Sequence, residues 1–283
     1  MKKNLTKAVL YPVLLIAILR GITPFVYAII DDRSMMEILS GQYLGHPDSH
    51  AIFLGYWYSL ILTGLYRISA HIDWYALLFL AVQWGCMGLI LYRVQGQAKE
   101  QDVQGRRVAQ TMVIFFLVGL QTVTQLTFTT TAAVVAATML YWYVTSEKIE
   151  GKQFAVLLLL CFLTQQIRSE IFLMILPVCS LFWFIRMHRR GIRGMGRWEF
   201  CLPVLAAAVL EIAFLGNIVG YGSPEWKAYS QYNQYRSDIY DYPDYTFPPY
   251  EGAEDLYAAA GIHTKSRART LINYDYTADD QIT

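Results

Sequence analysis

The stretch that decides the fold is DDRSMMEILSGQYLGHPDSH, residues 31–50, the first long polar interruption in the chain. It follows the apolar run Val9–Ile30 directly and begins with two adjacent carboxylates, Asp31 and Asp32. A helix needs about 20 consecutive apolar residues to cross the hydrocarbon core of a membrane. The pattern therefore predicts a membrane-spanning helix that ends at an acidic pair.

The composition indicates a membrane protein. Of the 283 residues, 55% are hydrophobic and only 16% are charged, whereas about a quarter of the residues in an average soluble domain carry a charge. The formal net charge of +1 gives no bulk attraction for nucleic acid, so we expect no nucleic-acid partner. The four cysteines lie within apolar segments without CxxC spacing, which favours buried thiols over a disulfide framework or a zinc site.

Apolar runs recur along the chain, and we predict an all-α integral membrane protein with about seven transmembrane helices. The expected spans are Val9–Ile30, Trp74–Tyr92, Gln110–Val123, Thr131–Val144, Phe154–Leu163, Ile171–Ile185 and Phe200–Val219. The apolar segment Ala51–Ile68 is left out, because counting it as a span would put the basic loop after Tyr92 on the outer face, against the positive-inside bias. We expect this segment to lie in the membrane interface.

The same bias sets the expected orientation. The N-terminal lysines and the basic loops after Tyr92 and Ile185 should face the cytoplasm of a multi-pass protein in the cell membrane. We expect two regions, a transmembrane module over residues 1–220 and an extracytoplasmic, acidic, tyrosine-rich region over residues 221–283. Short helices are expected in the second region at Glu225–Tyr240 and Glu254–Ala260.

The polar stretch after the first span is expected to form a covered loop on the outer face. The apolar side chains that surround Glu37 within residues 35–39 are typical of an amphipathic helix. Together with Ala51–Ile68, that helix would roof a cavity above Asp31 and Asp32. A carboxylate in such a place can act as a general base or as a metal ligand. The alternative is that the acids simply end a span and face water.

This arrangement resembles the GT-C superfamily of polytopic glycosyltransferases, which use polyprenyl-phosphate-linked sugars. The resemblance covers roughly Lys2–Gly220 in topology, and the acidic pair after the first span is its one motif-like feature. The family places its catalytic aspartate in the first outer loop, which implies Asp31 or Asp32 as the base. Arg168, in the outer hairpin before Ile171, resembles a family arginine that contacts the lipid-linked phosphate.

The chain also departs from the family pattern. Some members carry a second acid in the next outer hairpin, where this chain offers only glutamine and threonine, so no metal ligand set is predicted although a divalent cation is possible. Family members usually have more spans than are expected here, which implies that the chain is an N-terminal fragment.

The resemblance implies transfer of a sugar from a polyprenyl-phosphate donor to an extracytoplasmic glycan, lipid or protein acceptor in cell-envelope glycan synthesis. Two alternatives stay open. One is a transporter or flippase of lipid-linked or small solutes, and the other is a non-catalytic membrane protein of envelope assembly. Glu37, about one and a half turns beyond the acidic pair, competes with Asp31 and Asp32 for the role of base.

Further polar residues are candidates for substrate binding. Arg168 either contacts the donor phosphate or forms a hairpin salt bridge with Glu170. His46, Asp48 and His50 carry ligand-type side chains at close spacing. We interpret this His-Pro-Asp-Ser-His segment as a loop that contributes to the substrate site rather than as a metal centre.

Two charged residues interrupt apolar spans. Arg20 and Glu211 sit near the middle of the first and the last expected span, where an ionised side chain costs about 2.5–3.5 kcal/mol on insertion scales. Their similar depth predicts a structural ion pair. The alternative is a polar patch that lines a transport path.

Overall fold

The computed structural model describes residues 2–97, 101–240 and 247–273. The chain divides into two compact units, Met1–Gly222 and Ser223–Thr283. Positions 241–246 and 274–283, which include Tyr242, Tyr245, Asp241 and Asp244 of the tyrosine-rich acidic region, lie outside the described residues.

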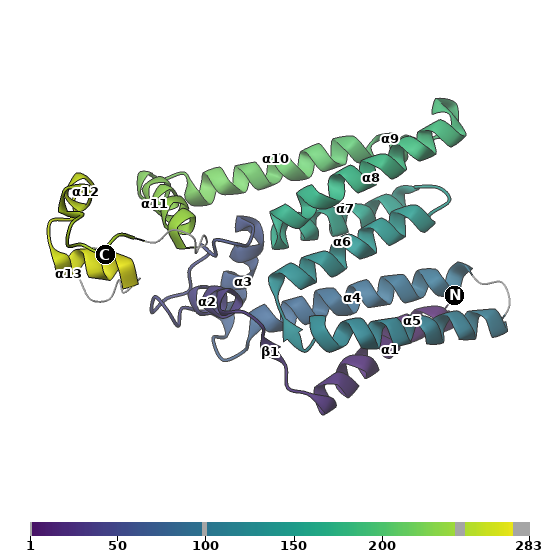
Figure 1. Ribbon diagram of the computed structural model, residues 1–283. Coiled ribbons are helices and arrows are strands. Elements are labelled where there is room, and N and C mark those ends of the chain that lie inside the picture. The colour runs from purple at the N-terminus through teal and green to yellow at the C-terminus, as the bar shows by residue number, and fades with distance from the viewer. Residues whose placement is uncertain (1, 98–100, 241–246, 274–283) are drawn as a thin grey trace. The chain divides into compact units, whose positions relative to one another are not determined.

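The first unit is built almost entirely of helices (Figure 1). They are α1 (Lys2–Ile22), α2 (Ile30–Ser40), α3 (Tyr56–Ile68), α4 (Trp74–Gln97), α5 (Gln101–Thr122), α6 (Phe128–Thr145), α7 (Gly151–Ile167), α8 (Ser169–Arg190), α9 (Arg197–Phe200) and α10 (Leu202–Tyr221). Two short strands, β1 (Val26–Tyr27) and β2 (Gln125–Leu126), and a 3-10 turn at Ile192–Gly194 complete it. The predicted all-α class is confirmed.

Four helices are long and apolar enough to cross a membrane, namely α1 from Asn4, α4, α8 and α10, and α7 is a shorter apolar helix. This set is compatible with a multi-pass membrane protein. The other expected spans are helical as well. Gln110–Val123 falls largely within α5, whose first turns are polar, and Thr131–Val144 falls within the threonine-rich α6.

The first span is shorter than its apolar run predicts. Helix α1 ends at Ile22 rather than at Ile30, two residues before Pro24, and the residue preceding a proline is disfavoured in the helical region. The chain then runs extended, and β1 pairs in parallel with β2 through a bond from the Val26 N–H to the Thr124 carbonyl at 2.9 Å. The acidic pair therefore lies in the first turn of α2 and does not end the span.

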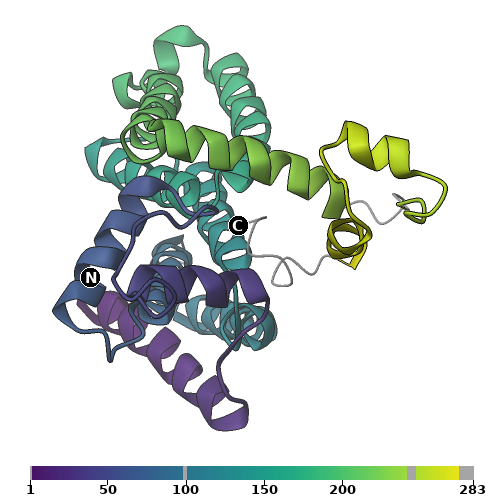
Figure 2. The same ribbon diagram turned by 90° about the vertical axis from the view of Figure 1, so that its left-hand side faces the viewer.

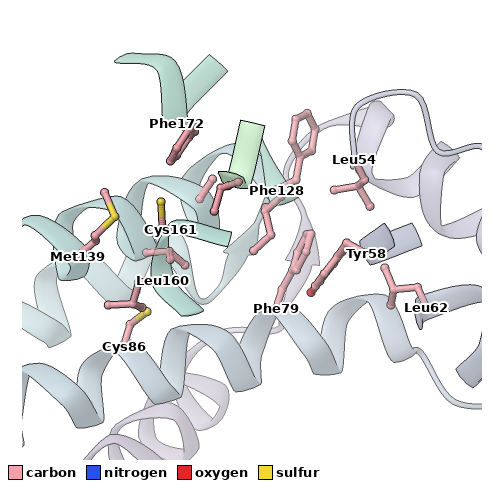
Figure 3. Packing of buried hydrophobic residues seen from close by; sticks show 14 of the residues in the cluster. Leu54, Tyr58, Leu62, Phe79, Cys86, Phe128, Met139, Leu160, Cys161 and Phe172 are labelled. Carbon is pink, nitrogen blue, oxygen red and sulfur yellow. The ribbon is translucent and has the colours of Figure 1, made fainter. Parts of the chain in front are cut away.

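Buried apolar side chains from several helices form one large core. Tyr58 of α3, Phe79 of α4, Phe128 of α6 and Leu160 of α7 belong to it, and Figure 3 shows how closely they gather. A second cluster joins α1 to α4 and α5 around Leu19 and Leu91, both 0% exposed. Burial of this area supplies the main driving force for packing.

Helices α2 and α3 lie at one end of the bundle, called the Asp32 end from here on; Figure 2 shows α2 crossing it. Asp32, Met35 and Leu39 are all buried, because residues spaced three and four apart share one face of a helix. Helix α3 docks on α7 where the Gly55 N–H donates to the Gln166 carbonyl at 2.6 Å. A Cβ at position 55 would lie 3.0 Å from the Gln166 Cα, so the contact needs glycine.

The opposite end, called the Arg186 end, holds the start of α1, the end of α4, the α6–α7 turn and α9 (Figure 1). Glu199 of α9 is 1% exposed and pairs with Arg186 at 3.0 Å and with Arg190 at 3.6 Å. Arg186 also donates to the carbonyl of Tyr143 at 3.0 Å. This cluster ties α8 and α9 to the end of α6.

The second unit contains α11 (Pro224–Tyr240), α12 (Glu254–Ala259) and α13 (Lys265–Asn273). The first two match the helices predicted at Glu225–Tyr240 and Glu254–Ala260, whereas α13 was not expected. The Tyr257 hydroxyl donates to the Pro248 carbonyl at 2.6 Å, which fastens α12 to the preceding segment.

Candidate functional site

Asp32 is the most completely enclosed carboxylate at the Asp32 end, with 0% of its surface exposed. Its Oδ1 accepts a hydrogen bond from the Tyr75 hydroxyl at 2.7 Å and another from the Phe128 N–H at 2.8 Å. Its Oδ2 accepts none from the described part of the chain. One carboxylate oxygen is thus fixed by α4 and α6 while the other is uncommitted.

This environment changes the proton affinity of the group. Burial raises the pKa of Asp32 from 3.8 to about 6, against the hydrogen bonds from Tyr75 and Phe128, which lower it. The neighbouring Asp31 raises the pKa further and Arg168 lowers it. A carboxyl that titrates near neutrality is suited to accept a proton and to release it again.

Arg168 lies at the junction of α7 and α8, and its side chain contacts Phe128, the residue whose N–H binds Asp32. Its guanidinium stands over the ring of Phe128 at 4.7 Å and over that of Phe53 at 5.8 Å, and these two rings are stacked 5.7 Å apart. Its Nε is 3.2 Å from Glu170, so the predicted hairpin salt bridge is present. Phe128 therefore contacts both candidate groups, Asp32 through its backbone and Arg168 through its ring.

A hydrogen-bonded network supports Tyr75 from behind. Asp73, which precedes α4, accepts from the Tyr27 hydroxyl at 2.5 Å and from the Tyr66 hydroxyl at 3.2 Å. The Tyr66 hydroxyl in turn accepts from the backbone N–H of Tyr75 at 3.1 Å. These bonds join β1, α3 and the start of α4. They fix the position of Tyr75, whose hydroxyl donates to Asp32.

The other acids of the stretch are placed differently. Asp31 is exposed, although it is adjacent to Asp32 in sequence. Glu37 forms an ion pair with Arg33 at 2.9 Å, one turn apart on α2. Burial therefore distinguishes the two members of the acidic pair, since Asp32 is enclosed and Asp31 is exposed, and Glu37 has a cationic partner.

The histidine-containing loop forms a different contact. His50 Nδ1 lies 2.5 Å from Asp48 Oδ1, and His50 Nε2 lies 2.9 Å from the carbonyl of Gly220 at the end of α10. Burial raises the pKa of Asp48, but the hydrogen bonds and charge of His50 hold it below 3.8 overall. His46 is exposed. Asp48 and His50 thus join this loop to α10.

Arg20 and Glu211 are not brought together. Arg20 on α1 is exposed and stands over the ring of Phe25 at 5.7 Å, and Glu211 on α10 is exposed as well. Figure 1 shows α1 and α10 on opposite sides of the bundle, with α4, α6 and α7 between them. The predicted ion pair is absent among the described residues, because the two spans are not neighbours.

Within the described residues, no three His, Cys, Asp or Glu side chains are grouped so that they could hold a metal ion. At the Asp32 end, a buried carboxyl and a guanidinium, those of Asp32 and Arg168, both contact Phe128. Such a pair can deprotonate an incoming hydroxyl and stabilise a leaving anion.

Two members of the site escaped the sequence reasoning. Tyr75 was not singled out within the span that begins at Trp74, and Phe128 contributes a backbone N–H, which every residue except proline has. The sequence predicted an amphipathic helix around Glu37, and the structure shows that Asp32 shares the buried face of that helix with Met35 and Leu39. Comparison with protein-family models, curated proteins and solved structures finds no match for this chain.

Proposed function

We propose that the protein is a membrane glycosyltransferase of the GT-C type, which transfers a sugar from a polyprenyl-phosphate donor to an acceptor hydroxyl. The observation that carries the proposal is Asp32, a fully buried carboxyl with one uncommitted oxygen and a pKa near 6, beside the cation Arg168. A proton acceptor and an anion stabiliser at one end of a helical bundle are what this transfer requires.

In the proposed step, the acceptor oxygen attacks the anomeric carbon of the donor sugar. The new glycosidic C–O bond forms as the bond from that carbon to the phosphate oxygen breaks. The acceptor proton passes to Oδ2 of Asp32, and the electron pair of the broken bond leaves on the polyprenyl phosphate, whose charge Arg168 stabilises. General-base assistance of this kind is typically worth about 10²–10⁴-fold in rate.

Two features of Arg168 suit this role. It lies at the N-terminus of α8, where the helix dipole favours a bound anion. The stacked rings of Phe53 and Phe128 hold its guanidinium, so its remaining N–H groups are oriented before a ligand arrives. Because Asp32 is fully enclosed, an acceptor reaches it only when a covering side chain moves aside.

The proposed orientation follows from the charges. The Arg186 end is rich in basic residues, and we assign it to the cytoplasm. These residues are Lys7, Arg93, Lys148, Lys152 and Arg186. The Asp32 end and the second unit then face the extracytoplasmic side of the cell membrane, and the protein works in cell-envelope glycan synthesis. Seven spans are part of this assignment, with α5, α6 and α7 crossing beside the four long apolar helices.

The test uses purified protein in nanodiscs with a panel of polyprenyl-phosphate hexoses and pentoses, together with a set of glycan, lipid and peptide acceptors that carry free hydroxyl groups. The measured product is free polyprenyl phosphate, which is common to every sugar and acceptor. Asp32→Asn should lower its release at least about 100-fold, and the adjacent, exposed Asp31→Asn should stay within about twofold. Full activity of Asp32→Asn with any donor that the wild type uses would contradict the proposal, as would no release from the whole panel.

A further inference from the structure

Two adjoining cavities open at the Arg186 end, far along the helices from Asp32. One has a volume of about 790 Å³ and is lined by polar side chains from the end of α4 and the α6–α7 turn. The other, of about 530 Å³, is an apolar groove between α1, α4, α6 and α7. Tyr92, Arg93 and Gln153 line both, so the polar cavity and the apolar groove form one continuous space.

Arg93 stands at the junction of the two. Its Nε donates to Thr145 Oγ1 at 3.2 Å, one Nη donates to the Thr145 carbonyl at 2.5 Å, and its guanidinium stands over the Trp142 ring at 5.6 Å. A guanidinium has five N–H donors, and these bonds use two of them. The cation is therefore held in a fixed position with donors left for a ligand in the space that it lines.

The groove owes its shape to two glycines of α4. A Cβ at Gly88 would lie 3.0 Å from the Ala8 carbonyl oxygen, so glycine there lets α1 pack closely. A Cβ at Gly85 would meet nothing within 4 Å, and this position leaves open space along the groove. Trp84 fixes the wall by donating to the Val9 carbonyl at 3.1 Å.

Charges of both signs line the space. Lys152 and Arg93 both line the groove, and two cations there suit a phosphate at the level where the groove meets the polar cavity. Lys148, Glu147 and Glu150 line the polar cavity, and the two carboxylates suit an ammonium group beyond that phosphate. One class of membrane lipid, the ethanolamine phospholipids, carries an apolar chain, a phosphate and a primary amine in this order.

We propose that this space is a specific site for a phospholipid with an ethanolamine headgroup. One acyl chain would occupy the groove past Gly85, the phosphate would bind Arg93 and Lys152, and the ammonium would face Glu147 and Glu150. The lipid would join the N-terminal helix α1 to α4 and to the α6–α7 turn. This site does not depend on the proposed glycosyl transfer.

Native mass spectrometry of the full chain, released from detergent with added phosphatidylethanolamine, tests the site. The wild type should retain one lipid. Arg93→Gln should weaken its retention by about tenfold or more, because a hydrogen bond to a charged group is lost. Gly85→Leu should abolish it, since Gly85 lines the groove, a Cβ there meets nothing within 4 Å, and the added side chain would occupy the space of the acyl chain. The matched controls are Arg106→Gln, an exposed arginine of α5, and Gly64→Leu, another helical glycine with open space around it.

Ligands that lack one part of the lipid test the contribution of the acyl chain, the phosphate and the amine separately. Glycerol 3-phosphate and diacylglycerol should both bind at least tenfold more weakly than the whole lipid, and phosphatidylglycerol should bind more weakly than phosphatidylethanolamine. Equal retention by Gly85→Leu and wild type would overturn the site even where Arg93→Gln fails to fold. Equal binding of phosphatidylglycerol would overturn the role of Glu147 and Glu150, and equal binding of diacylglycerol would overturn that of Arg93.

Discussion

The backbone N–H of Phe128 donates to Oδ1 of Asp32 at 2.8 Å. The ring of the same phenylalanine carries the guanidinium of Arg168 at 4.7 Å. One residue at the start of α6 thus positions both the carboxyl and the cation, although 96 and 40 residues of chain separate it from them. The geometry of this pair depends on the docking of α2 and of the α7–α8 junction on α6.

Removing the Tyr75 hydroxyl should change the pH dependence of transfer. In Tyr75→Phe the ring still packs on Phe79, at 4.5 Å between centroids, but a hydrogen bond that lowers the pKa of Asp32 is lost. The pKa should rise above about 6. Because the base works when it is deprotonated, the pH of half-maximal release of polyprenyl phosphate should move upward in the same direction.

A second tyrosine serves as the control for that shift. Tyr58 is buried and stacks on Phe79 at 6.1 Å between ring centroids, and its hydroxyl has no hydrogen-bond partner among the described residues. Tyr58→Phe should leave the pH profile in place. An unchanged profile in Tyr75→Phe would show that the hydroxyl does not act on the titrating group.

Two substitutions of Asp32 should distinguish its contribution to stability, as a hydrogen-bond acceptor, from its proposed role as a base. Asp32→Leu leaves two buried donors, the Tyr75 hydroxyl and the Phe128 N–H, without an acceptor, and each costs about 1–3 kcal/mol. Asp32→Asn keeps an oxygen for both. Thermal unfolding in detergent should show a large fall in Tm for the leucine variant and a small change for the asparagine variant.

The stability of the protein should also depend on pH through this group. The folded state binds the Asp32 proton more tightly than the unfolded chain does, since its pKa is about 6 rather than 3.8. The wild type should therefore lose stability as the pH rises from about 4 to above 6. Asp32→Asn lacks this loss, so the difference in Tm between the two should shift in favour of the variant over that range. A constant difference would contradict the raised pKa.

Gly55, which precedes α3, should tolerate no side chain, whereas Gly64 within α3 should. A Cβ at position 55 would lie 2.4 Å from Gln166 Oε1 and 3.0 Å from the Gln166 Cα. Gly55→Ala should therefore separate α3 from α7 and cost about 1–3 kcal/mol. Gly64→Ala meets nothing within 4 Å and should be neutral or stabilise the helix by up to about 1 kcal/mol. Urea or thermal unfolding of both variants checks the contrast.

The ion-pair cluster at the Arg186 end should respond unequally to loss of its members. Glu199→Ala removes the common partner of Arg186 and Arg190, and Arg186 is only 12% exposed. Breaking a buried pair in this way typically costs about 3–5 kcal/mol. Arg190→Gln should cost much less, because Arg190 is 34% exposed and Arg186 still pairs with Glu199. Similar Tm values for the two variants would contradict a buried cluster.

Local signals in the sequence were enough for most of the helices. The apolar runs located α4, α8 and α10 within a few residues, because burial in a membrane or in a helical core demands the same side chains along the whole element. The apolar side chains around Glu37 within residues 35–39 likewise predicted an amphipathic helix, which the structure shows as the longer α2, Ile30–Ser40. The sequence also offered three acids within seven residues, Asp31, Asp32 and Glu37, as candidates for the proposed base.

Only the tertiary structure decided how these parts meet. The end of α1 at Ile22 depends on Pro24 and on a parallel pairing of β1 with β2, a contact between segments about a hundred residues apart that no local pattern encodes. Arg20 and Glu211 each lie near the middle of an expected span, but helix packing places α1 and α10, which carry them, on opposite sides of the bundle. Tertiary structure also decided which of the adjacent aspartates is enclosed, because neighbouring residues point to different sides of a helix. The bonds from Tyr75 of α4 and Phe128 of α6 to Asp32 determine which side of α2 is buried.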